Sequence, residues 1–173
     1  MGRGGPPAAP APVAAWADEA TPSPASVAIR VLLRLGAYTG EEGFRQVAEA
    51  ALELYRPVME QLPQATAGLW SALLAAEDGP PEVTLLLPAE DSPGAAEAVA
   101  DEWLRRLQRR YLPDLVLERA REGEPDVPLA RGRRAGDGRV TAYVCRGHAC
   151  LPPAVRWSEV ERRLAGGGEG GPT

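Results

Sequence analysis

The 173-residue sequence contains no lysine and no asparagine, and Ile29 is its only isoleucine. All nineteen basic residues are therefore arginines, a bias that we attribute to GC-rich coding, so their number says little about arginine chemistry. The net charge of −5 argues against broad binding to nucleic acid or to an acidic membrane, because both reward a basic face. We therefore expect neither a nucleic-acid partner nor a membrane partner.

Cysteine is scarce as well, and two cysteines are too few for a secreted disulfide scaffold of this size. No apolar run approaches the roughly 20 residues of a membrane span, and Met1–Ala15 lacks the continuous apolar centre of a secretion signal. These absences predict a cytoplasmic protein. The sequence also lacks a glycine-rich phosphate loop, a catalytic triad and a converging carboxylate pair, so it indicates no catalytic residue and no cofactor.

The composition divides the chain into four parts. Residues 1–20 are rich in Gly, Pro and Ala and predict a disordered lead, because they cannot bury enough apolar area to offset the entropy of ordering. The glycine-rich residues 166–173 predict a disordered tail. Between them, residues 21–79 show helical periodicity, whereas residues 80–165 mix short apolar runs with helical stripes. We expect a helical part followed by a small α/β element.

The first folded part predicts three antiparallel helices joined by short turns. Ser23 can cap the first free amides, and Pro24 suits the first helical position. The predicted helices span Ala25–Ala37, Glu41–Gln61 and Pro63–Ala76, and Pro57 should kink or split the second one. The first helix is apolar on nearly every side, which is typical of a helix inside a larger assembly.

The second part predicts a three-stranded sheet with one crossover helix. Short apolar runs indicate strands at Glu82–Leu87, Asp114–Leu117 and Val140–Val144. Ser92 can cap a helix from Pro93 to Arg110, so the first two strands should be parallel neighbours joined by a right-handed crossover. The apolar stripe that should pack on the sheet includes Val99, Trp103 and Leu107, and the Asp101–Arg105 and Glu102–Arg106 pairs should support the helix.

Two further segments complete the second part. Arg119–Gly138 is rich in charge, proline and glycine and predicts a surface loop with a solvated run at Arg131, Arg133 and Arg134. Ser158 and Glu161 have capping-box spacing and predict a short last helix to about Ala165.

The candidate for chemistry is the loop after the last strand, where Cys145 and Cys150 flank the only histidine, His148. Two thiols can act as a redox couple if their Cα atoms come within about 7 Å, and a nearby histidine can promote thiolate formation. A zinc site usually needs four ligands, and only three candidates occur here. Redox and metal roles both remain open, and we expect reduced thiols that support a loop.

Several segments between Asp18 and Leu164 match one family. They are Pro22–Ala28, Leu32–Leu35 with Thr39 and Gly40, Ala48 and Glu49 before Leu52, and Ala142–Cys145 with Cys150 and Pro153. They resemble the C-terminal end of proteins that fuse an N-terminal thioredoxin-like domain to an (α/α)6 barrel of the N-acylglucosamine 2-epimerase kind, including the spermatogenesis-associated thioredoxin-like proteins of animals. This chain has Pro24 and Ala25 where the family has glycine and asparagine.

The resemblance implies a mixed α+β or α/β chain, in which residues 21–79 form part of an α/α toroid. The thioredoxin-like domain and most barrel helices are absent from the sequence, so it implies a truncated C-terminal portion of a six-hairpin glycosidase-like protein. Such a portion would not be catalytic alone and would act by self-association or with a protein partner. One alternative is a component of a carbohydrate-active barrel completed by another chain, and a second is a small thiol redox module.

Overall fold

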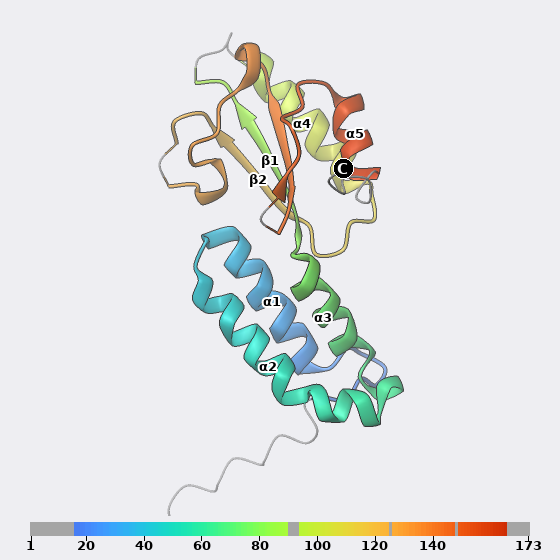
Figure 1. Cartoon of the computed structure of the whole chain (residues 1–173). Coiled ribbons are helices and arrows are strands. Elements are labelled where there is room, and N and C mark those ends of the chain that lie inside the picture. Colours follow the sequence, from blue (N-terminus) through green and yellow to red (C-terminus); the bar gives the residue numbers. More distant parts are fainter. Residues whose placement is uncertain (1–15, 90–93, 125, 148, 166–173) are drawn as a thin grey trace, which may run out of the picture.

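The computed structural model describes residues 16–89, 94–124, 126–147 and 149–165. Three helices lie together at one end of the molecule, and a sheet with two helices packed on it lies at the other (Figure 1). The mixed class of helices and strands predicted from the sequence is confirmed. We call residues 16–80 the helical unit and residues 81–165 the α/β unit.

The helical unit contains α1 (Pro24–Thr39), α2 (Glu42–Gln61) and α3 (Ala67–Asp78). Helix α1 begins as predicted, because the Ser23 side chain accepts a hydrogen bond from a backbone N–H in the first turn and a proline occupies the first helical position. It ends at Gly40, whose φ of 71° lies in the left-handed region that glycine adopts without penalty. The buried hydrophobic core of the unit consists of Ile29, Leu33, Ala48, Leu52, Met59, Leu69 and Ala72.

Proline shapes the second half of the unit. Pro57 lies inside α2 without splitting it, and the last turns of α2 run at an angle to the rest of the helix (Figure 1). The sequence predicts a third helix that begins at Pro63, but Pro63–Ala65 forms a separate 3-10 turn, η1. Helix α3 starts after it, because Thr66 has a non-helical φ of −132°.

Residues 16–20 belong to the helical unit, so the prediction of a disordered lead through residue 20 is wrong for them. Trp16 packs against the helical core. The Asp18 carboxylate accepts hydrogen bonds from the backbone N–H groups of Ser23 and Gly68, and the Asp18 N–H donates to Ala65. One carboxylate therefore ties the start of α1 to the start of α3.

The sheet has four strands in the order β2-β1-β3-β4. Strands β1 (Pro81–Leu87) and β2 (Val116–Arg121) are parallel, and α4 (Ala95–Gln108) lies between them in the chain, which confirms that they are parallel neighbours connected through a helix. Strand β3 (Thr141–Arg146) pairs with β1 in the antiparallel sense, which confirms that the three predicted strands share one sheet. The sequence did not predict the fourth strand, β4 (Ala149–Cys150), which pairs with β3.

Helices α4 and α5 (Trp157–Ala165) cover one face of the sheet. Trp103 and Leu107 of α4 are buried in this core as predicted, but Val99 is 39% exposed, so its predicted packing on the sheet is wrong. The rings of Trp103 and Trp157 lie 6.1 Å apart and join the two helices. The other buried residues of this core are Val83, Leu85, Leu87, Ala96, Ala100, Val140, Ala142, Val144, Ala154 and Val160.

The starts of these two helices differ from the prediction. Ser92 and Pro93, the expected cap and first residue of α4, lie outside the described residues. Helix α5 begins at Trp157, one residue before the predicted cap Ser158, so the predicted capping box is wrong. Instead the Glu159 carboxylate accepts a hydrogen bond from the backbone N–H of Val155, which satisfies a donor just before the helix.

The other face of the sheet is covered by the segment predicted as a surface loop, Arg119–Gly138. Its first residues continue β2 to Arg121, and it then forms two short turns, η2 (Pro128–Ala130) and η3 (Gly136–Gly138). Because the segment lies on the sheet, Leu86, Ala120 and Ala130 form a small buried cluster there. The sheet is therefore covered on both faces, as expected for the uncharged run from Val83 to Leu87 in its central strand β1.

Ion pairs link the surface of α4 to the edge strand β2. Glu102 and Arg106 form the predicted pair along α4. Asp101 pairs with Arg119 of β2 at 2.9 Å, and Glu97 pairs with both Arg119 and Arg121. Several arginines thus serve charge pairing on the protein surface.

The two units meet along one side of α1. The Tyr38 hydroxyl donates to the carbonyl oxygen of Leu117 at 3.0 Å and accepts from its N–H at 3.2 Å, so it occupies the open edge of β2. The Arg30 guanidinium pairs with the Asp114 carboxylate at 2.7 Å. Asp114 was predicted to start the second strand, but it lies before β2 with a φ of 64°.

Candidate functional site

The two cysteines lie opposite one another in the hairpin formed by β3 and β4 and are joined by a disulfide. The expectation of reduced thiols is therefore wrong. The chain reverses between β3 and β4, so that Cys145 and Cys150 become register partners with Cα atoms 4.0 Å apart. His148, the third candidate, lies outside the described residues.

Backbone hydrogen bonds hold the hairpin independently of the disulfide. The N–H of Leu151 donates to the carbonyl of Val144 at 2.9 Å. Further along, Ala142 and Ala154 exchange two backbone hydrogen bonds of 2.8 and 2.9 Å. Cys145 and Cys150 thus form a non-hydrogen-bonded pair that lies between hydrogen-bonded positions of the ladder. In non-hydrogen-bonded pairs the Cα atoms of opposite residues approach most closely.

The two cysteine residues differ in their exposure to solvent. Cys145 is 4% exposed because it lies on the sheet face covered by the segment around η2. Cys150 is exposed on the short edge strand β4. A reagent from solution therefore reaches the Cys150 side of the disulfide first.

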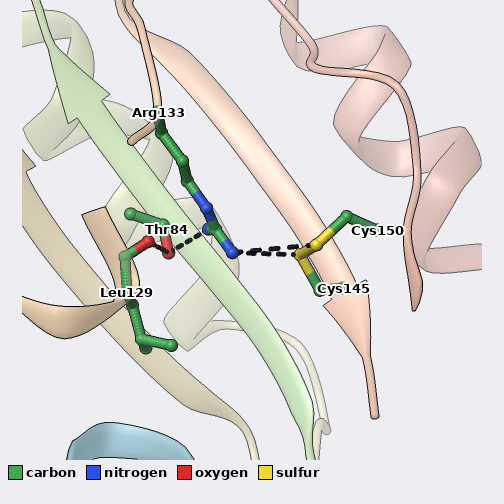
Figure 2. The surroundings of a disulfide bond; sticks show 5 residues. All are labelled: Thr84, Leu129, Arg133, Cys145 and Cys150. Carbon is green, nitrogen blue, oxygen red and sulfur yellow. Dashed lines mark hydrogen bonds between the residues drawn. A yellow bond between two sulfur atoms is a disulfide. The ribbon is translucent and has the colours of Figure 1, made fainter. Parts of the chain in front are cut away.

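Arg133 lies over the disulfide, and the sequence did not single it out (Figure 2). Its Nη2 is 3.3 Å from Sγ of Cys145 and 3.7 Å from Sγ of Cys150, and its Nη1 donates to the Thr84 hydroxyl at 2.7 Å. The guanidinium also stacks over the Tyr143 ring, with 4.9 Å between its central carbon and the ring centroid. Arg133 is half-buried, so its predicted place in a solvated charge run is wrong.

Thr84 and Tyr143 fix the guanidinium without help from the sulfur atoms. Thr84 is fully buried in β1, and its hydroxyl lies 3.5 Å from the carbonyl of Leu129. The Tyr143 hydroxyl donates to the carbonyl of Arg134 and accepts from its N–H, which anchors the chain next to Arg133. The cation is thus held in place by two neighbouring strands.

Burial lowers the pKa of the Arg133 guanidinium, and the electrostatic interactions with Glu82 and Tyr143 oppose this effect. Glu82 lies on β1 directly opposite Cys145 in the strand register. An arginine keeps its proton even in such surroundings, so the site contains a cation, a carboxylate and a disulfide on one face of the sheet.

The sequence could not have identified Arg133, because Arg131 and Arg134 lie in the same polar run. Arg134 is 88% exposed at its side chain and Arg131 is exposed, although both are chemically identical to Arg133. Only the path of the segment across the sheet distinguishes the three residues.

No group of three or more His, Cys, Asp or Glu side chains in the described part of the chain could hold a metal ion. None of the described helices is long and apolar enough to cross a membrane. No protein-family model, curated protein or solved structure matches the chain.

Proposed function

We propose that the chain is the C-terminal portion of a thioredoxin-domain-containing, epimerase-barrel-like protein and acts by association, without catalysis of its own. A row of exposed apolar side chains on α1 supports the association. Val27, Val31 and Leu35 follow one another at intervals of four residues and are 47%, 49% and 38% exposed. Side chains at this spacing form a ridge on one face of a helix, and such ridges pack into grooves of another helix.

The ridge lies beside the side of α1 that contacts the α/β unit. Arg30, Arg34 and Tyr38 make the polar contacts to residues 114–117, whereas the three ridge residues carry no charge and no polar atom. The occupant that fits is therefore an apolar helix face. In an α/α barrel this would be a neighbouring helix pair, and in a solution of this chain alone it is the same ridge of a second copy, related by two-fold symmetry.

Analytical ultracentrifugation over a range of protein concentrations tests this association. The mass should rise with concentration for the natural chain and stay at that of a monomer for the double variant Val27→Gln/Val31→Gln. Val99→Gln is the matched control, because Val99 is 39% exposed on α4 in the other unit, and it should associate like the natural chain. A natural chain that remains monomeric at every concentration contradicts the proposal.

The family assignment has a separate test in the DNA beside the gene. A neighbouring reading frame that encodes a thioredoxin-like domain and further α/α helix pairs would supply the natural occupant of the ridge. Co-expression of the two products should then give one stable complex that Val27→Gln/Val31→Gln weakens. Unrelated reading frames on both sides would contradict the family part alone.

A further inference from the structure

Reducing the disulfide should leave the fold intact. The ring that it closes runs only from Cys145 to Cys150, and a short ring removes little entropy from the unfolded chain. The backbone bonds of Leu151 and Ala154 to β3 already hold the hairpin. The disulfide is therefore largely redundant as a structural link.

The position of Arg133 is explained better by the reduced state than by the disulfide. A disulfide sulfur is neutral and a weak acceptor, so a half-buried guanidinium gains little from pointing at it. A thiolate at the same position would carry a full negative charge 3.3 Å from Nη2 of Arg133. The arrangement thus favours the state in which Cys145 is ionised.

We propose that Cys145 and Cys150 form a reversible thiol–disulfide couple that accepts electrons from a dithiol, with Arg133 stabilising the thiolate of Cys145. The exposed Cys150 is the sulfur attacked, and the buried Cys145 is the leaving group. This activity is independent of the association through α1.

The reaction balances as an exchange between two dithiol–disulfide pairs. A thiolate of the dithiol attacks Sγ of Cys150 and forms a mixed disulfide, and the electron pair of the broken bond leaves on Sγ of Cys145. The second thiol of the dithiol then loses its proton and attacks the mixed disulfide, which releases Cys150 as a thiolate. The dithiol ends as a disulfide, oxidised by two electrons. Of the two protons that it lost, one passes to the Cys150 thiolate and the other to solvent, while Cys145 stays ionised beside Arg133.

The charged groups around the couple act in opposite directions. The Arg133 cation favours the Cys145 thiolate, whereas Glu82, opposite Cys145 on β1, disfavours it by like-charge repulsion. Tyr143 holds Arg133 through its ring. Replacing Arg133 should therefore slow the exchange, and Glu82→Gln should accelerate it.

The test measures the rate at which dithiothreitol reduces the disulfide of the folded full chain at neutral pH. Free thiols are trapped by alkylation and counted by mass spectrometry. We expect Arg133→Gln to slow reduction about fivefold to tenfold, and Arg133→Lys to restore part of the rate because it keeps the charge. Arg134→Gln is the matched control, since this neighbouring arginine is 88% exposed, and it should react like the natural chain.

A second measurement needs no variant of Arg133 and therefore does not depend on how such a variant folds. The reduced Cys150→Ser chain is alkylated at Cys145 over a range of pH, and the reaction should reach half its maximal rate below about pH 8.5, the value for a free thiol. Half-maximal reaction at or above that pH would overturn the proposal. Equal reduction rates for Arg133→Gln and Arg134→Gln would also overturn it, as would a disulfide that dithiothreitol reduces only after the chain is unfolded.

Discussion

The helical unit and the α/β unit bury their apolar residues to different extents. The α/β unit has a core on each face of its sheet, with twelve buried residues under α4 and α5 and three under the segment around η2. The helical unit has one core of seven buried residues and leaves Val31 49% and Leu74 61% exposed. A sheet covered on both faces needs no further element, whereas three helices in one group leave outer faces that another helix can cover.

The largest expected effect comes from a substitution in the core of the α/β unit. Trp103→Ala removes a ring that is 6% exposed and contacts Trp157, so it should cost about 3–5 kcal/mol of the free energy of unfolding. Trp70→Ala in α3 is the matched substitution in the helical unit, and it should cost less because Trp70 is only partly buried. Urea unfolding of both variants measures the difference. An equal or larger loss of stability for Trp70→Ala would show that the core of the helical unit buries its tryptophan as effectively as the core of the α/β unit does.

A smaller effect is expected where the units join. Gly79 has a φ of 71°, and a Cβ there would lie 2.6 Å from the Cα of Gly147. Gly79→Ala should therefore cost about 3 kcal/mol, from backbone strain plus a clash between two turns. Gly40→Ala is the comparison, because Gly40 has the same φ but a ψ of 10°, in the left-handed region, against 150° at Gly79. No atom lies within 4 Å of its added Cβ, so it should cost only about 1 kcal/mol. Equal losses in urea unfolding would show that neither the ψ of Gly79 nor the close approach of the two turns makes its substitution more costly than that of Gly40.

The smallest effect concerns Asp18, which ties two helices of the helical unit together. Although burial opposes its ionisation, the N–H groups of Gly68 and Ser23 lower the pKa of the Asp18 carboxyl. Its contribution to stability is therefore fully present above the pKa of the unfolded chain, near pH 4, and is lost as the pH falls through the folded value. The loss should not exceed about 1 kcal/mol, because solvent still screens the partly exposed carboxyl.

Unfolding of the natural chain and of Asp18→Asn between neutral pH and about pH 2 measures this loss. The difference in stability between the two chains should shrink on acidification, because the variant has no carboxyl to protonate at this position. A difference that stays constant across that range would show that the charge of Asp18 does not stabilise the helical unit.

The sequence by itself determined most of the local structure. The start of α1 at Ser23 and Pro24, the uncharged run of β1 and the apolar stripe of α4 are properties of neighbouring residues, and short-range sterics and periodicity specify them. The parallel pairing of β1 and β2 also followed, because a strand–helix–strand sequence has one favoured crossover.

Only the tertiary structure decided the candidate site. Whether Cys145 and Cys150 form a disulfide depends on the register of a hairpin whose second strand has two residues, too few for a recognisable pattern. The contact of Arg133 with those sulfur atoms depends on how a polar segment crosses the sheet, and no local periodicity encodes that path. Residues 12 apart in sequence come within 3.3 Å because the buried Thr84 and the ring of Tyr143 hold the guanidinium in place, and such long-range packing exists only in the folded chain.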